Sequence, residues 1–108
     1  MPGNANKINI SAGLFKAFNF EQLTIAATAV GLTTATYTTD GEKAKRALIT
    51  CETAQLRYRY DGTDPTATVG HMLNPFDVLV LTGSDNITNF RAIRAGGTSA
   101  TLFCTYEN

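Results

Sequence analysis

The chain has no tryptophan, a single histidine, two cysteines and few charged side chains. Its 108 residues carry nine basic and nine acidic groups, so the formal net charge is zero and only 17% of residues are charged. A surface this poor in charge argues against nucleic acid as a partner, because phosphate binding requires clustered Lys and Arg. It also lacks the self-repulsion that keeps a protein monomeric. We therefore expect no nucleic-acid partner, and we expect assembly into a homo-oligomer.

Long apolar runs are also missing, so no segment is expected to span a bilayer and no membrane partner is expected. The first residues, MPGNANK, lack the charged stretch and apolar core of a secretory signal. We therefore expect synthesis in a cytoplasm, where thiols stay reduced. Cys51 and Cys104 are expected as small core-facing side chains without a disulfide. The alternative is an inter-sheet disulfide of the antibody-domain type.

No recognisable catalytic or cofactor motif is present, and we expect the protein not to be an enzyme. His71 is the only histidine, and its local neighbours Val69–Leu73 include no nucleophile and no carboxylate to orient it. Gly96-Gly97-Thr98 does not have the spacing of a phosphate-binding loop. We expect no catalytic residues and no bound cofactor.

A metal site is not expected either. Two cysteines and one histidine do not reach the four ligands of a zinc site at any recognised spacing. Turn carboxylates suit Ca²⁺, but no EF-hand spacing occurs and each of these side chains has a role in a turn. The carboxylates considered are Asp61, Asp64, Asp77 and Asp85.

The segment Leu56–Tyr60 alternates apolar and basic side chains, with the tyrosines on one face and the arginines on the other. This period of two is typical of a half-buried β-strand. Asp61-Gly62 follows, and this dipeptide favours a turn because glycine takes positive φ without steric cost. The sequence therefore predicts a strand that ends in a turn, with Gly62 at positive φ.

Similar segments recur along the chain, separated by turn residues. Asp40-Gly41 and Gly96-Gly97 are typical of hairpin turns. Phe76–Leu81 is apolar apart from Asp77, which predicts a strand buried on both faces. Strands spaced by about 8–12 residues indicate an all-β sandwich or barrel. The remaining expected strands include Ala47–Thr53, Ile87–Arg94 and Ser99–Tyr106.

The N-terminal part fits this pattern less well. Residues 1–7 are polar and carry Pro2 and Gly3 without periodicity, and residues 8–25 are ambiguous between a helical turn and short strands. We expect an N-terminal arm over residues 1–19 and a β-sandwich domain over residues 20–108. The fold class is therefore all-β, a single antiparallel β-sandwich of jelly-roll or Ig/fibronectin-III-like type with a short N-terminal arm.

Several segments together resemble a group of small tailed-bacteriophage proteins, mostly of unassigned function, whose genes lie among those for virion structural proteins. These segments are RYRYDGTDPT (57–66), GHML (70–73), FDVL (76–79), NFRAI (89–93) and GTSATL (97–102), and the resemblance covers about residues 28–106. The YxxDGTxPT core is also similar to strand–turn segments of fibronectin-III-like modules in carbohydrate-active enzymes. The first resemblance implies a virion location, with synthesis in the host bacterial cytoplasm.

The expected function is that of a bacteriophage virion structural protein, specifically a capsid decoration (cement) protein that binds the outer shell. Its expected partner is the major capsid protein. One alternative is a small tail or head–tail junction component, and another is a carbohydrate-binding β-sandwich module. Apolar side chains with no place in a sandwich pattern usually mark a contact surface. The expected capsid or subunit contacts are Leu14, Phe15, Phe18, Phe20, Arg57 and Arg59.

Overall fold

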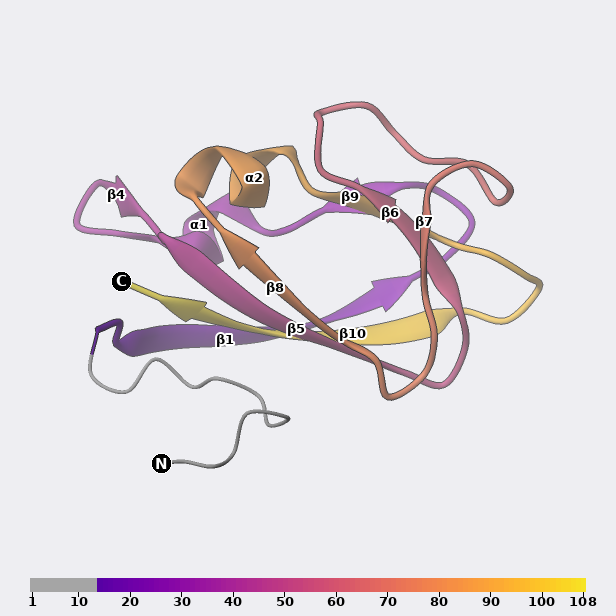
Figure 1. The fold of residues 1–108 in the computed structure, drawn as a ribbon, viewed down its shortest axis with the longest axis horizontal. Helices are drawn as coiled ribbons and strands as arrows, with labels where there is room; N and C mark the ends of the chain where they lie inside the picture. The colour runs from indigo at the N-terminus through magenta and orange to yellow at the C-terminus, as the bar shows by residue number, and fades with distance from the viewer. Residues whose placement is uncertain (1–13) are drawn as a thin grey trace.

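Two four-stranded antiparallel sheets form most of the molecule (Figure 1). The computed structural model describes residues 14–108. The first sheet has the strand order β1-β10-β5-β8 and the second has the order β2-β9-β6-β7. The first sheet comprises β1 (Ala17–Ile25), β10 (Ala100–Glu107), β5 (Arg46–Glu52) and β8 (Val78–Thr82). The second comprises β2 (Val30–Gly31), β9 (Arg91–Arg94), β6 (Leu56–Arg59) and β7 (His71–Leu73).

Three smaller features complete the fold. A two-stranded ribbon pairs β3 (Thr38–Thr39) with β4 (Glu42–Lys43). Two short helices, α1 (Thr34–Tyr37) and α2 (Ser84–Asn89), precede β3 and β9. Neither helix in residues 14–108 is long and apolar enough to cross a membrane.

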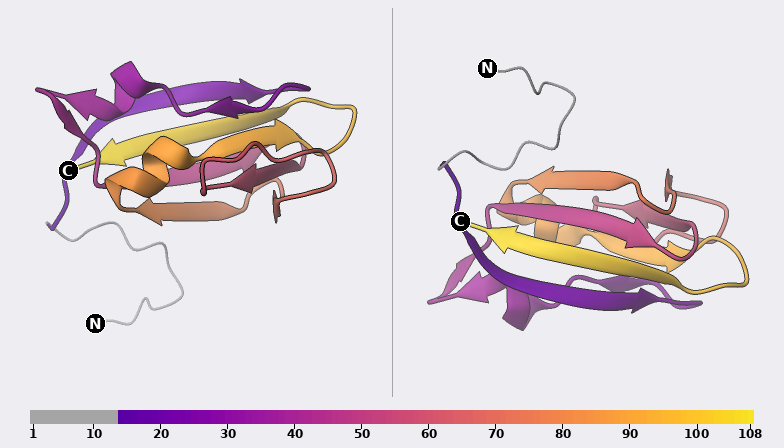
Figure 2. Two further views of the ribbon diagram at one scale, coloured as in Figure 1. Left: turned by 90° about the horizontal axis from the view of Figure 1, so that it is seen from above. Right: turned by 90° about the horizontal axis from the view of Figure 1, so that it is seen from below.

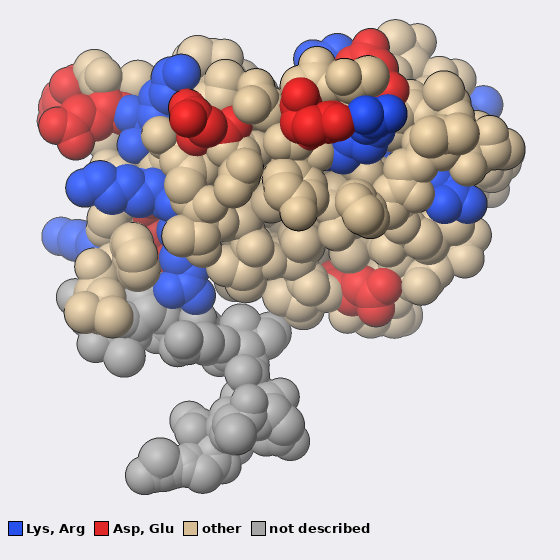
Figure 3. Space-filling model, turned by 45° about the horizontal axis from the view of Figure 1, so that its top comes forward, with Lys and Arg blue, Asp and Glu red and all other residues tan. Residues whose placement is uncertain are grey.

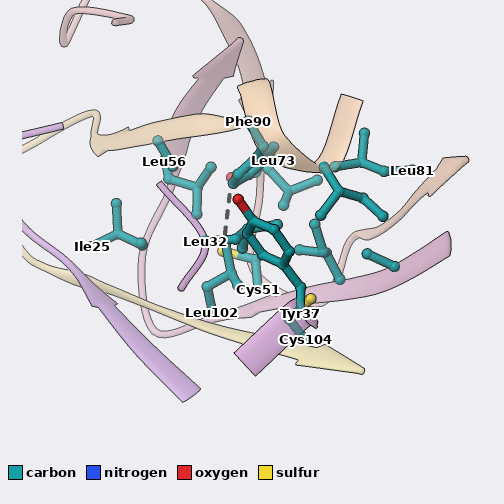
Figure 4. Close-up of a cluster of buried hydrophobic side chains, with 14 of the residues drawn as sticks. Ile25, Leu32, Tyr37, Cys51, Leu56, Leu73, Leu81, Phe90, Leu102 and Cys104 are labelled. Atoms are coloured by element: carbon teal, nitrogen blue, oxygen red, sulfur yellow. Dashed lines mark hydrogen bonds between the residues drawn. The ribbon is translucent and has the colours of Figure 1, made fainter. Parts of the chain in front are cut away.

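The two large sheets lie one over the other, as the views from above and below show (Figure 2). Buried side chains of both sheets meet between these layers (Figure 4). Ile25 and Leu102 come from the first sheet, and Leu56 comes from the second. Burying an aliphatic or aromatic side chain contributes about 1.5–3 kcal/mol, so this shared core holds the layers together. Phe90, next to α2, fills the same cluster.

Alternation along β5 and β10 explains why these strands form the centre of the first sheet. In β10 every second residue from Ala100 to Tyr106 is buried, and β5 shows the same pattern from Ala47 to Cys51. Side chains of a strand point alternately to its two faces, so one face of each strand enters the core. The predicted alternation in both segments is confirmed.

Both cysteines are fully buried and free, as their predicted core positions require. They lie in the same sheet, on the neighbouring strands β5 and β10, where Cys51 opposes Leu102 and Cys104 opposes Ile49. The two cysteines are therefore diagonal neighbours, at a separation of about 7–8 Å. An inter-sheet disulfide does not fit this arrangement, because the two residues do not belong to opposite sheets.

Two of the expected strands differ from the structure. β8 begins at Val78 and is an edge strand with alternating exposure, so the prediction of a strand buried on both faces was wrong. Phe76, the first residue of that apolar run, is 84% exposed. The segment Ile87–Arg94 begins in α2 and becomes a strand only at Arg91. Its buried apolar residues are Ile87, which lies in α2, and Phe90, which is the C-cap of that helix. In so short a segment, the spacing of apolar residues does not distinguish a helical turn from a strand.

The turn predictions had mixed outcomes. Asp40 and Gly41 both have positive φ and join β3 to β4 as a two-residue hairpin, so this prediction is confirmed. Gly62 has a φ of +87°, as predicted. The Gly96-Gly97 hairpin was wrong, because β9 belongs to the second sheet and β10 to the first. The chain reverses at Gly96-Gly97 as it crosses from the second sheet to the first.

The expected boundary between residues 19 and 20 falls inside β1. This strand begins at Ala17, which opposes Glu107, and continues with an irregularity to Asn19, which opposes Tyr106. Two of the last three residues of the expected arm, Ala17 and Asn19, are therefore paired with β10. Residues 1–13 of that arm lie outside the described residues.

Candidate functional site

The four apolar residues near the N-terminus that were expected to contact a capsid or a neighbouring subunit lie in different environments. Leu14 is 83% exposed, and Phe20 is 56% exposed. Phe18 is partly buried and packs against the core. Phe15 is half-buried over the Arg46 guanidinium, whose central carbon lies 5.3 Å from the ring centroid. Only Leu14 and Phe20 are thus widely open to a partner.

Phe15 has an intramolecular role at the end of the first sheet. Beneath it, Arg46 forms an ion pair with Glu107 at 3.4 Å between Nε and Oε1, and both side chains are almost fully buried. A buried ion pair is tolerated only when its charges are well partnered, and the ring contributes a cation–π contact to the guanidinium. Phe15 therefore closes the sheet end.

Arg57 and Arg59 project from the outer side of the second sheet, where Arg59 opposes Arg91 across β6 and β9. Each of these three arginines already forms hydrogen bonds or an ion pair within the chain. Arg57 donates to the carbonyls of Ala67 and Gly70, while the other two pair with aspartates of the β6–β7 loop. The ion pairs are Arg59–Asp61 at 2.5 Å and Arg91–Asp64 at 2.7 Å. These arginines anchor the loop. On the face that Figure 3 shows, acidic and basic side chains lie next to one another in small groups separated by uncharged surface.

The outward side of the first sheet is uncharged across its centre. The register places two rows of directly opposed residues across the four strands, one through Phe20 and one through Phe103. We call these eight residues the outer face: Phe20, Thr105, Leu48 and Val80 in one row, and Gln22, Phe103, Thr50 and Val78 in the other.

The outer face combines exposed apolar side chains with uncharged polar ones. The rings of Phe20 and Phe103 stack with centroids 6.1 Å apart, and Val78 and Val80 are exposed on the edge strand. Isolated exposed apolar residues are normal, but a contiguous group on one sheet face is typical of an interaction surface. In the view from below this sheet lies in front of the second one (Figure 2).

Phe76, which lies just before β8, is a further exposed aromatic residue that was not singled out from the sequence. Its backbone has a φ of +73°, and the Asp77 N–H donates to the Asn74 carbonyl at 3.0 Å, which fits a type II turn with Pro75 at the second position. Glycine or asparagine is usual where Phe76 stands, because a bulky side chain is strained at positive φ. The side chain is nevertheless exposed to solvent, two residues before Val78 in the sequence. The Asn74-Pro75 dipeptide was the available signal for this turn.

A second candidate site is a pocket of about 700 Å³ where the β6–β7 loop faces α2. Its lining includes Tyr60, His71 and Val69, together with Asp61 from the loop and Asn86 from α2. The bidentate hydrogen bonds from Arg59 hold the pKa of the Asp61 carboxyl at about 2. The carboxylate is thus charged over the whole ordinary pH range. No local pattern in the sequence groups these side chains, because the loop and the helix that form the pocket are distant along the chain.

The aromatic side chains beside this pocket form a continuous group. Buried Phe90 lies 5.7 Å from half-buried Tyr58 between ring centroids, and Tyr58 lies 6.5 Å from exposed Tyr60. His71 is 5.3 Å from Tyr58 and 6.2 Å from Tyr60. Tyr58 packs against buried Phe90, so the rings of Tyr60 and His71 lie on a rigid support.

The remaining ionisable groups of note are structural. Burial raises the pKa of Cys51 to about 11 and that of Cys104 to about 12, so both thiols stay protonated and unreactive. Burial also raises the pKa of Tyr106 far above its usual range, and this hydroxyl donates to Glu21. Among residues 14–108, no group of three or more potential metal ligands is found.

Comparison with known proteins gives no relative: no protein-family model, no curated protein and no solved structure matches this chain.

Proposed function

We propose that the protein is a bacteriophage virion structural protein, a capsid decoration protein that binds the outer shell through the outer face of its first sheet. It acts by binding and assembly, without catalysis. The observation that carries the proposal is the accessible, uncharged outer face with its stacked phenylalanines and edge valines. A stable contact needs an apolar centre depleted of charge, which this surface supplies.

We also propose a specific type of fold for the two sheets. Two antiparallel sheets around one shared core support a single antiparallel β-sandwich of jelly-roll or Ig/fibronectin-III-like type. Such a rigid body suits a cement protein, because it offers a preformed surface and loses little conformational entropy on binding. The zero net charge supports close packing of copies as a homo-oligomer on the virion.

The shell contact is proposed to centre on the edge strand β8 and the adjoining turn. Val78 and Val80 are open along this edge, and Phe76 is exposed in the turn that precedes it. Phe20 reaches the same face from β1. Leu14 lies beyond it as a peripheral contact. Arg57 and Arg59 are not part of this surface, because they project from the second sheet and anchor the β6–β7 loop.

Charge substitution at Val80 tests this proposal. Purified Val80→Glu and Val80→Lys variants are added to particles that lack the protein, and bound protein is measured by densitometry. We expect both variants to bind at least about tenfold more weakly, because either charge would be buried without a partner. Weaker binding by both the acidic and the basic variant would show that burial of a charge is the cause, because repulsion by a charged partner would affect only one of them.

Val69→Glu is the matched control. Val69 is also an exposed valine, but it lies on the β6–β7 loop and not on the outer face. We expect this variant to bind as the parent does, and thermal unfolding checks that all variants are folded. Full binding by both Val80 variants would overturn the assignment of this surface. Binding confined to tails or to the head–tail junction would favour the alternative virion location.

A further inference from the structure

We propose that the pocket between the β6–β7 loop and α2 binds a neutral saccharide, with Tyr60 and His71 as the stacking surface. Tyr60 is 43% exposed and lies in the pocket lining beside His71 and Val69. Neither ring is needed to close the core, since buried Phe90 and half-buried Tyr58 lie beneath them. The pocket therefore exposes aromatic surface that packing does not explain.

The polar groups around these rings suit hydroxyl groups. The Arg59–Asp61 pair presents a planar guanidinium and a carboxylate, and the side-chain exposures of 32% and 57% leave both accessible. Asn86 uses one amide hydrogen on the Thr82 carbonyl, at 2.9 Å. A guanidinium, a carboxylate and an amide together have more donors and acceptors than these bonds occupy. They surround an apolar surface with directional partners, as small-molecule sites require.

The paired charges around the pocket favour a neutral ligand over an anionic one. Asp61 neutralises Arg59 at the pocket, and Asp64 neutralises Arg91 on the neighbouring strand. No excess charge attracts a phosphate or a nucleic acid. A sugar ring has an apolar face of C–H groups that packs on an aromatic ring, and its hydroxyls both donate and accept. Tyrosine combines an apolar body with a polar tip and fits such a ligand.

The pocket is separate from the outer face. The β6–β7 loop rises from the second sheet, on the opposite side of the molecule from the first sheet (Figures 1 and 2). A copy bound to a surface through its first sheet would thus keep this pocket open. The saccharide site does not depend on the capsid proposal, and its residues are different.

The test is an array of neutral and anionic oligosaccharides, followed by calorimetric titration of the parent chain with the strongest neutral glycan. Tyr60→Ala is expected to weaken binding at least about tenfold, and Tyr60→Phe to keep most of it, because the ring face remains. Phe76→Ala is the control, as it removes an exposed ring that does not line the pocket. It should bind as the parent does.

Two results would overturn the proposal. One is the absence of binding to any neutral glycan on the array, or binding that Tyr60→Ala leaves unchanged. The other is a preference for anionic glycans or for a proline-rich peptide tested in parallel, which would assign the aromatic surface to another ligand class. Particle binding by Tyr60→Ala should be normal, so the outcome is distinguishable from failure of the capsid proposal.

Discussion

Gly62 is held at a φ of +87° at the start of the β6–β7 loop, directly beside the ion pair of Asp61. A β-branched residue is strongly disfavoured at this φ. We predict that Gly62→Val lowers the free energy of unfolding by about 1–2 kcal/mol. Urea denaturation measures this change.

Gly97→Val is the control for that substitution. Gly97 lies outside the left-handed region and has open space where a Cβ would be added. Its replacement should change stability by less than about 0.5 kcal/mol. Equal effects at the two positions would show that backbone strain at Gly62 is not the cause.

The two buried thiols predict a dependence on alkaline pH. Their ordinary pKa is 9.0, and burial raises it to about 11 for Cys51 and about 12 for Cys104. Above pH 9 the unfolded chain loses these protons while the folded protein keeps them, so folding becomes less favourable as pH rises toward 11. The urea midpoint should fall from pH 8 to pH 10.5, and less so in Cys51→Ala/Cys104→Ala. An unchanged midpoint would contradict the burial of both thiols.

At the scale of elements, the β7–β8 turn combines strain with exposure. Phe76 has positive φ and contributes nothing to the core. Replacing it with glycine relieves the backbone, so Phe76→Gly should raise the free energy of unfolding by about 0.5–1 kcal/mol. The same variant should bind particles more weakly, because the projecting ring is lost.

Phe76→Ala separates the two effects. Alanine keeps the unfavourable φ but removes the ring, so particle binding should fall without a gain in stability. Thermal unfolding and densitometry of bound protein measure both quantities. A loss of stability in Phe76→Gly would mean that the ring is packed, contrary to its 84% exposure.

Elements with strict alternation were predictable from the sequence, and those set by tertiary contacts were not. Leu56–Arg59 and Ala100–Tyr106 follow a period of two, because one face of each strand enters the core. Gly96-Gly97 correctly marked a reversal, but the local residues contain no information on which strand lies alongside. Pairing partners depend on the whole chain, so the crossing between sheets at this point was not foreseen.

At the scale of the whole molecule, only part of the candidate surface was predictable. The sequence indicates Phe20 as a contact residue because it has no place in the expected sandwich pattern, and the structure exposes it on the outer face. Phe15 and Phe18 were selected for the same reason, yet they close the molecule's own sheet end and core. The pocket combines Asn86 with the distant loop, and no local pattern relates them.

The proposed arm can now be tested at a sharper boundary. Removing residues 1–13 leaves β1 and its pairing with β10 intact, whereas removal of residues 1–19 would cut into that strand. We predict that the shorter chain keeps its thermal midpoint but occupies particles less fully, because the arm adds contacts to a neighbour. Equal occupancy would show that the arm makes no contribution. A large fall in the midpoint would assign these residues to the domain itself.

A cryo-EM map of phage particles that contain the protein would show whether it binds the outer capsid through its first sheet. We predict density for the two sheets at repeated positions on the outer capsid, with Phe20, Val78 and Val80 of the first sheet against the shell. The β6–β7 loop should point to solvent. Density at the tail alone, or contact with the capsid through the second sheet, would show that the proposed binding surface is wrong.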